Sequence, residues 1–416
     1  MIEGQIIKFY REKEGWTQSK LVQGICSVTH LSKIERGITE YSHEITTLLA
    51  KRLDINIEKE VRNYHQIHQK LIDWHEAMIM QRTENVERLK MEIEYEPLKD
   101  CSDFLNQYLL LHARYHLFKL QTDQAYQLLT TIPGQEVQLT TYEQSLCKHI
   151  WGIYYFLTGQ FIQCIEVLKS INQDQYNHQE YFYHLAIAYH SIHSNITSYY
   201  YAEKALHYFR KTLNMLRIID TETIMIVQLN TRELHDFEET KQKYETLLKT
   251  CDTCHSMDRK VKLINNFAFE HFRRKMYREA SILYEEAIKL INKEDPMYLI
   301  CLEGYVQACY KGKLLSDKML LELANEGLQL AEEQHNKKES ICFTLHIYSI
   351  QEDHEGYYHF LETKALPHIR ESGETIFIDH YEKKLFQYYL QKGRTADALE
   401  LAAAMNNSRK SYYDHE

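Results

Sequence analysis

The sequence predicts an all-α protein in two parts, a small N-terminal helical bundle followed by a long array of repeated helical hairpins. Three observations predict this fold class. Only 4 Pro and 13 Gly occur among 416 residues, which favours long helices joined by short turns. Apolar residues follow helical spacing from about Ile57 to Ala404. A similar turn segment recurs every 38 to 40 residues between Thr122 and Thr395, which is typical of repeat proteins.

Residues 1–57 are expected to form the bundle. Gly15 ends the first helix, and Gly24 allows a tight turn between the second and third helices. Thr17 and Ser27 are good N-cap residues for those two helices, and Gly37 ends the third. The side chains expected in the bundle core are Ile6, Ile7, Tyr10, Leu21, Val22, Leu31, Ile34, Ile45, Leu48, Leu49 and Leu53. The arrangement is that of a helix-turn-helix.

The pattern of residues 17–37 resembles the lambda-repressor-like (XRE-type) helix-turn-helix, and the resemblance covers residues 1–57. The matching positions are Thr17, Gln18, Leu21, Gly24, Ser27 and the run Leu31–Gly37. The resemblance implies that the second helix touches a DNA phosphate and that the third reads the major groove. The residues it implies at the DNA are Gln18, Ser27, Val28, Thr29, His30, Ser32, Lys33, Thr39 and Tyr41. Glu35 is expected to pair with a nearby basic side chain instead.

Charge supports a DNA contact confined to the N-terminus. Residues 1–37 carry six basic and four acidic side chains, a net charge of +2. Because the whole chain has a net charge of −10, residues 38–416 carry a net charge of −12. An acidic body repels DNA. Residues 1–60 hold nine basic and nine acidic side chains, which predicts weak non-specific affinity and specific binding as a dimer on a two-fold site. The alternative is a helix-turn-helix kept only for packing or dimerisation.

Residues 58–95 are expected to form one or two linker helices, with an apolar face at Leu71, Ile72, Trp74, Met78 and Ile79. Residues 96–407 then form about eight hairpins with a period of about 39 residues, and residues 408–416 form a frayed tail. The recurring turn positions are Thr122, Phe161, Tyr199, Phe237, Tyr277, Asp317, Tyr357 and Thr395. Three residues later, six of the eight side chains are small, which lets two helices approach closely.

The segment from Leu263 to Ala287 resembles a tetratricopeptide repeat, with the Ala/Tyr/Ala rhythm of its second helix. The resemblance implies a right-handed superhelix with an inner groove for an extended peptide. Asn266 matches the asparagine with which such proteins hold a peptide backbone, because an amide both donates and accepts. Other candidates for a peptide carboxylate are Arg232, Arg273 and Arg274. The alternatives are a locally satisfied asparagine and a solvated arginine face.

No catalytic, metal or cofactor motif is found. The sequence lacks the glycine-rich phosphate and dinucleotide motifs and the nucleophile elbow. Cys251, Cys254 and His255 lack a second ligand pair at zinc spacing. No apolar run of about 18 residues and no signal peptide occur. Nine scattered cysteines fit a reducing compartment. We therefore expect a cytoplasmic protein that is not an enzyme and contacts no membrane.

Together the two parts resemble the Rap–NprR–PlcR–PrgX (RNPP) group of quorum-sensing regulators of Gram-positive bacteria, and within it the NprR-like members. The resemblance implies a cytoplasmic transcription regulator that binds double-stranded DNA as a homodimer or higher oligomer. A short signalling peptide in the repeat domain would control DNA binding and oligomeric state through a population shift. The alternative, also implied by the group, is a Rap-like regulator that binds a response regulator of the sporulation phosphorelay. The two roles are compatible.

Overall fold

The structure, a computed structural model, describes residues 2–38, 42–132, 139–230, 236–372 and 375–413. These residues are almost entirely helical and contain no strand, in agreement with the predicted fold class. The chain divides into two compact units, Met1–Gln228 and Leu229–Glu416, which are described one at a time.

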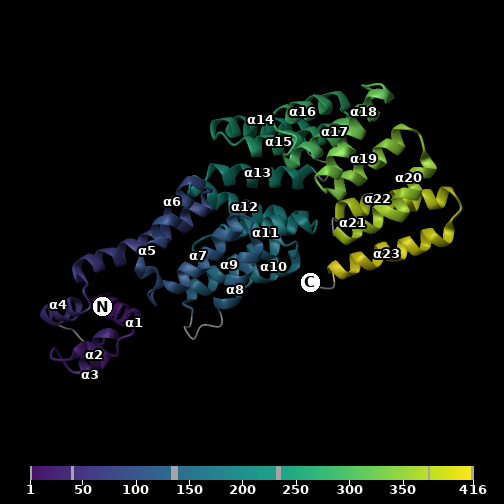
Figure 1. Ribbon diagram of the computed structural model, residues 1–416. Helices are drawn as coiled ribbons and strands as arrows, with labels where there is room; N and C mark the ends of the chain where they lie inside the picture. The colour runs from purple at the N-terminus through teal and green to yellow at the C-terminus, as the bar shows by residue number, and fades with distance from the viewer. Residues whose placement is uncertain (1, 39–41, 133–138, 231–235, 373–374, 414–416) are drawn as a thin grey trace. The chain divides into compact units, whose positions relative to one another are not determined.

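The first unit contains the bundle, the linker helices and the first repeats (Figure 1). Its elements are α1 (Ile2–Lys13), α2 (Gln18–Val22), α3 (Val28–Glu35), α4 (His43–Arg52), α5 (Ile57–Ile79), α6 (Thr83–Glu94), the 3₁₀ turn η1 (Pro97–Asp100), α7 (Leu105–Phe118), α8 (Thr122–Thr131), α9 (Thr141–Leu157), α10 (Phe161–Lys169), α11 (Tyr181–Ser191), α12 (Asn195–Lys211) and α13 (Met215–Asn230). Helix α13 crosses the boundary between the units by two residues.

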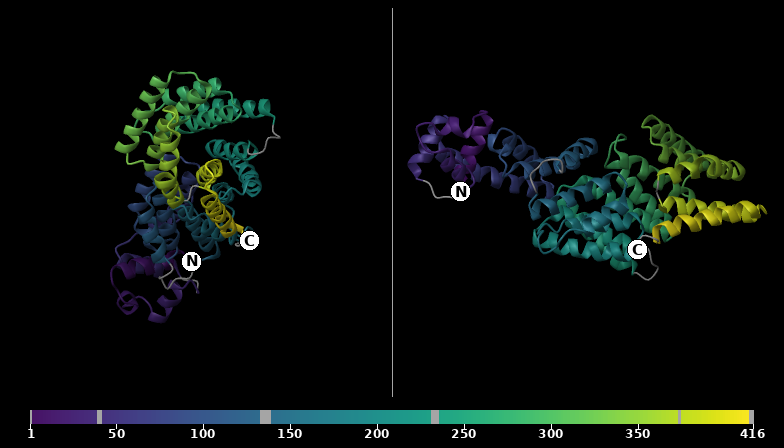
Figure 2. Two further views of the ribbon diagram at one scale, coloured as in Figure 1. Left: turned by 90° about the vertical axis from the view of Figure 1, so that its right-hand side faces the viewer. Right: turned by 90° about the horizontal axis from the view of Figure 1, so that it is seen from below.

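The second unit continues the hairpins (Figure 2). Its elements are α14 (Phe237–Thr253), α15 (Met257–Arg273), α16 (Tyr277–Lys289), α17 (Pro296–Gly312), α18 (Asp317–Glu333), α19 (Lys337–Ile350), α20 (His354–Phe360), one π-helical turn η3 (Leu361–Ala365), α21 (Leu366–Ser372), α22 (Thr375–Gln391) and α23 (Thr395–Tyr413). Within the unit, α15 contacts α17 and α17 contacts α19, and each of the three packs against the helix that follows it.

The recurring turn positions coincide with the starts of the second helices of the hairpins. Six of the eight are the first residue of a helix, whereas Tyr199 is the fifth residue of α12 and Tyr357 is the fourth of α20. The residue three positions later is buried in seven hairpins: Ala125, Cys164, Ala202, Thr240, Ala280, Leu320 and Ala398. In the remaining hairpin, Phe360 is half-buried. Burial of mostly small side chains here permits close approach of the paired helices.

The turns inside the hairpins explain how a glycine-poor chain bends so often. In seven hairpins, one residue of the turn has a positive φ of 52° to 76°. Glycine holds this position in only two of them; the seven residues are Leu120, Gly159, His193, Lys275, Lys313, Glu352 and Gly393. Left-handed backbone at a non-glycine residue costs about 1–2 kcal/mol. The other five turns are therefore sustained by the packing of the helices on either side.

Several expectations are corrected. Leu48 and Ile72 were expected in apolar faces, but their exposed fractions are 44% and 39%, because each lies on the outer side of its helix. Helix α23 is described to Tyr413, and the frayed tail expected for residues 408–416 stays a prediction. The division at Gln228 was not predicted. It falls within α13, near the C-terminal end of that helix.

Candidate functional site

The N-terminal bundle, formed by α1–α4, has the local geometry of a helix-turn-helix. Thr17 caps α2 by accepting a hydrogen bond from the Lys20 amide at 3.2 Å. Ser27 caps α3 in the same way, with the His30 amide at 3.1 Å. Gly24 joins the two helices with φ +75°. Gly37 ends α3 with φ +65°, and its amide donates to the Ile34 carbonyl, as expected of a glycine beyond a helix C-terminus.

Backbone contact between α1 and α3 fixes how α3 is presented. A Cβ atom at Gly4 would lie 2.1 Å from the carbonyl oxygen of Ile34, so only glycine permits this approach. The side chains of the bundle core are fully buried: Ile6, Ile7, Leu21, Leu31, Ile34 and Leu49. Helix α3 is therefore held by a packed core and leaves its other face open.

The residues implied at the DNA differ in how far they reach solvent. Thr29 and Lys33 are exposed on α3, as is Val28, whose exposed fraction is 40%. Ser27 is also exposed, although its hydroxyl is used in the cap. Ser32 and His30 are half-buried. Thr39 and Tyr41 lie outside the described residues.

His30 and Gln18 present less to solvent than the resemblance implied. The Nε2 atom of His30 is buried and has no hydrogen-bond partner among the described residues. This atom does not reach a base edge unless the ring turns. The Gln18 amide donates to Glu35 Oε2 at 2.8 Å, so its carbonyl oxygen is the part left for another contact.

Glu35 is the structural anchor that the sequence indicated. Arg11 donates to both of its carboxylate oxygens, from Nε at 2.6 Å and from Nη2 at 2.9 Å. Both residues are buried. The Arg11 Nη1 atom also donates to the Trp16 carbonyl at 2.9 Å. This charged cluster joins α1, the α1–α2 turn, α2 and α3, and it makes Glu35 unavailable to DNA.

The consequence for charge is large, because Glu35 is the only acidic residue between positions 17 and 37. Lys20, Lys33 and Arg36 in the same segment are exposed. The Lys20 ammonium lies 4.0 Å from the centre of the Trp16 ring. The helix-turn-helix therefore exposes only positive charges, although residues 1–60 are balanced overall. Such a surface attracts phosphates.

Two supports of the bundle had no signal in the sequence. Arg11 is 24 positions from Glu35. Arg52 on α4 donates to the Leu21 carbonyl at 2.9 Å and also to the carbonyl of Gln23, about 30 positions away. Contacts of this separation depend on the tertiary fold and have no local pattern. Arg11 holds the turn before α2 through the Trp16 carbonyl, and Arg52 holds the C-terminal end of α2 through the Leu21 carbonyl.

The peptide-binding candidates in the second unit lie along α15. Asn266 is half-buried, and among the described residues its side-chain amide makes no hydrogen bond. Arg273 and Arg274 lie two helical turns further on and flank the buried Glu270, at 3.6 and 2.9 Å. The Arg274 guanidinium also lies 4.5 Å from the centre of the Phe237 ring. Arg232 lies outside the described residues.

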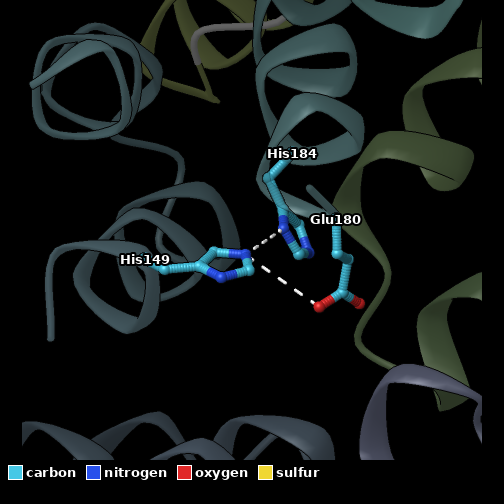
Figure 3. A group of neighbouring side chains, drawn as sticks. All are labelled: His149, Glu180 and His184. Atoms are coloured by element: carbon cyan, nitrogen blue, oxygen red, sulfur yellow. Dashed lines mark hydrogen bonds and ion pairs between the residues drawn. The ribbon is translucent and has the colours of Figure 1, made fainter. Parts of the chain in front are cut away.

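A buried polar cluster, which the sequence did not predict, occupies the core of the first unit (Figure 3). His149 Nε2 lies 3.0 Å from His184 Nδ1 and 4.0 Å from Glu180 Oε2. The potential ligand atoms of these three residues lie within 4.8 Å of one another. Burial lowers the pKa of both histidines well below 6.5. Their donor atoms are thus close enough to one another to surround a metal ion.

The charges around this cluster oppose a metal ion. Glu180 is already paired with two guanidiniums, those of Arg114 and, at 3.3 Å, Arg217. Burial alone would raise the pKa of Glu180, but these two cations hold it below its usual value. A divalent cation here would share a low-dielectric interior with both guanidiniums, which is strongly unfavourable. His149 Nδ1 also has a partner in the Tyr176 hydroxyl at 2.9 Å. The cluster is a largely paired polar core.

The segment Cys251–His255 likewise does not form a metal-ligand set among the described residues. Cys251 is buried and Cys254 is half-buried. Of the helices described, none is long and apolar enough to cross a lipid bilayer.

Comparison with known proteins supports a regulatory role. No protein-family model matches the chain. It is 21% identical to the transcriptional activator NprA of Geobacillus stearothermophilus over 389 residues, which cover 89% of this chain and 94% of NprA. It is 22% identical to the regulatory protein RapD of Bacillus subtilis over 290 residues, which cover 66% of this chain and 78% of RapD.

Solved structures agree in fold. The apo form of the quorum sensor NprR from B. thuringiensis superposes with a TM-score of 0.68 and 19% identity, covering 85% of this chain and 99% of that one. NprR in complex with its cognate peptide NprX superposes with a TM-score of 0.64 and 18% identity, covering 83% and 99%. These relatives are named as regulators or sensors and not as enzymes, in agreement with the lack of catalytic motifs in the sequence.

Proposed function

Because the chain is a member of the RNPP group of quorum-sensing regulators and resembles NprR and NprA, we propose that it is a cytoplasmic transcription regulator controlled by a short signalling peptide. In this proposal the N-terminal bundle binds double-stranded DNA. The repeats of the second unit hold the peptide. Peptide occupancy changes how two subunits pair and therefore how two bundles fit one operator.

The observation that carries the DNA-binding proposal is the charge of the exposed helix-turn-helix. Its only carboxylate is buried against Arg11, so Lys20, Lys33 and Arg36 meet the phosphates without an opposing charge. Thr29 and Lys33 are the side chains best exposed for contact with base edges, and Val28 offers a methyl surface for thymine. Three exposed cations give a modest non-specific affinity. A homodimer on a two-fold site would double the contacts.

Asn266 supports the peptide-binding proposal. Its unpaired amide is able to accept from one peptide N–H group and donate to one C=O group, which holds an extended chain whatever its sequence. NprR has been solved with its cognate peptide, and it shares the fold of this chain. Arg273 and Arg274 are held by Glu270. They would take a peptide carboxylate only by sharing it with Glu270, and we therefore assign them a secondary role, with Arg232 as a third candidate.

A selection of duplexes from a random DNA pool by the full-length chain tests DNA binding. We expect a two-fold sequence to be enriched. Lys33→Ala should weaken binding of that duplex about 5- to 20-fold. Lys289→Ala, which removes an exposed lysine of the second unit, is the matched control and should leave binding unchanged. Failure to enrich any sequence, with or without peptide, would exclude this function.

A second candidate function is supported by the similarity to RapD, which covers 78% of that regulatory protein. In this alternative the peptide-free chain binds a response regulator of the sporulation phosphorelay. Co-purification of the full chain with that response regulator, before and after peptide addition, tests it. Binding that peptide abolishes would support a dual role, and absence of binding in both states would exclude the alternative.

A further inference from the structure

One buried side chain joins two helices that are far apart in the sequence. The Asn214 amide nitrogen donates to the Ile79 carbonyl at 2.9 Å, across 135 positions. Its amide oxygen accepts from the Arg217 backbone amide at 3.2 Å. Asn214 has an exposed fraction of only 1%. It therefore caps the C-terminal end of α5 and the N-terminal end of α13 at the same time.

Both contacts satisfy groups that a helix cannot satisfy itself. Ile79 is the last residue of α5, and its carbonyl has no partner within the helix. Arg217 belongs to the first turn of α13, where the amides are also unpaired. The negative end of one helix dipole meets the positive end of the other. The amide places its donor and its acceptor on two separate atoms, Nδ2 for the Ile79 carbonyl and Oδ1 for the Arg217 amide. The shorter side chain of serine has one oxygen only, so we expect it to retain the cap on α13 and lose the bond to Ile79.

Helix α5 is firmly attached to the DNA-reading bundle at its other end. Tyr10 of α1 donates to Glu60 of α5 at 2.8 Å. Further along, Tyr64 donates to Asp103 at 2.6 Å, and the fully buried Trp74 donates to the Val86 carbonyl at 3.1 Å. Glu60 and Ile79 are separated by about 28 Å along one continuous helix, at about 1.5 Å per residue. A displacement of one end of α5 therefore moves the other end as well.

Helix α13 is attached to the repeats and leads out of the unit. Arg217 contacts the buried Glu180 at 3.3 Å and lies over the Tyr183 ring. Gln228 contacts His190 at 2.7 Å, at the last residue of the first unit. The second unit begins at Leu229, inside the same helix. A conformational change in the second unit can therefore reach Asn214 through the continuous backbone of α13.

We propose that Asn214 is a positioning residue that couples the DNA-reading bundle to the helix leading into the peptide-binding unit. The coupling part of this inference rests on the proposed function. Bonds from one side chain to both helix ends make α5 and α13 move together, so that a rearrangement at the second unit alters how the bundle is presented. Through such a shared element, binding of the peptide changes the affinity for DNA, and binding of DNA changes the affinity for the peptide by the same factor.

The first measurement needs no peptide. Hydrogen–deuterium exchange of the full chain is compared for the wild type and for Asn214→Ser, which keeps an N-cap acceptor for α13. We expect exchange at residues 79–83 to accelerate about tenfold, the effect of losing one buried hydrogen bond. The control is Asn336→Ser, because Asn336 caps α19 through the Glu339 amide. Unchanged exchange at residues 79–83 would overturn the clamp.

The second measurement addresses coupling. DNA affinity is titrated with and without a peptide selected from a random octapeptide library by binding to the full chain. In the wild type the two affinities should differ, and in Asn214→Ser their ratio should fall towards 1 while peptide affinity stays within twofold. A wild-type ratio retained in the variant would overturn the coupling role. A ratio of 1 in the wild type would contradict the proposed function itself, and the exchange experiment would still decide the clamp.

Discussion

The Arg11 guanidinium holds both carboxylate oxygens of Glu35, at 2.6 and 2.9 Å, inside the N-terminal bundle. This ion pair ties α1 to the end of α3. It also removes the only negative charge of residues 17–37 from the exposed surface. One contact thus serves both the stability of the bundle and the sign of its charge.

We expect Glu35→Gln to destabilise the bundle, because an amide accepts through one oxygen only and leaves the buried Arg11 partly unpaired. The cost should be about 1.5–3 kcal/mol, the range for hydrogen bonds to charged groups. Faster hydrogen exchange in α1 and α3 would report it. Glu44→Gln changes an exposed carboxylate of α4 and serves as the control. Equal exchange in the two variants would contradict the anchoring role.

The first unit should lose stability as the pH falls below about 6.5. Burial holds the pKa of His75, His149 and His184 well below 6.5 and lowers that of His112 to about 4. The unfolded chain takes up protons below pH 6.5 while the folded chain does not, so stability decreases towards acid. For each of these histidines, the free energy of unfolding falls by up to about 1.4 kcal/mol for each unit by which the pH decreases.

Hydrogen exchange between pH 8 and pH 5, corrected for the intrinsic rate, measures this loss. Protection of α9 and α11 should decrease on acidification, while α16 and α18, which contain no histidine, provide the reference. His149→Gln should reduce the pH dependence, because glutamine keeps hydrogen-bonding groups near Tyr176 and His184 without a titrating ring. An unaltered pH dependence in this variant would show that His149 does not contribute.

Lys275→Gly should stabilise the second unit. Lys275 has φ +61° in the turn between α15 and α16 and is exposed. Glycine removes about 1–2 kcal/mol of backbone strain and adds about 0.4–1 kcal/mol of unfolded-state entropy, for a net gain of about 0.5–1 kcal/mol. Thermal unfolding measures the gain. Gly159→Ala, at the equivalent turn with φ +76°, should have the opposite effect; a loss of stability in Lys275→Gly would refute the strain argument.

Asn266→Ala should weaken peptide binding about 10- to 100-fold, the effect of losing two hydrogen bonds of about 1 kcal/mol or more each. Calorimetry with a library-selected octapeptide measures the affinity. Asn325→Ala on α18 is the matched control, because the Asn325 side chain bonds only to the Leu321 carbonyl of its own helix. Equal affinities for the two variants would remove Asn266 from the peptide site.

The sequence was sufficient for features with a local signal. Thr17, Ser27 and Gly37 have the predicted cap roles because each acts on residues within four positions. The repeat period located the second helices because a small side chain must recur wherever two helices approach closely. Five hairpin turns without glycine were not recognisable as left-handed, because packing and not residue type sustains them.

Long-range polar contacts could not be predicted. Nothing near Asn214 indicates a bond to Ile79, and nothing near Glu180 indicates Arg114, 66 positions earlier. The Gln18 amide was assigned to a phosphate, and only the fold shows it bonded to Glu35. Such partners depend on which helices meet. The family resemblance supplied the architecture without these contacts.

The central claim is that peptide binding in the repeats controls DNA binding by the bundle. The most direct measurement is the affinity of the full-length chain for its selected two-fold duplex, at fixed salt, with and without a saturating library-selected peptide. We predict a change of about 5- to 150-fold, the usual range of allosteric coupling, and the same change in peptide affinity when DNA is present. Equal DNA affinities in both states, with the peptide bound, would contradict it.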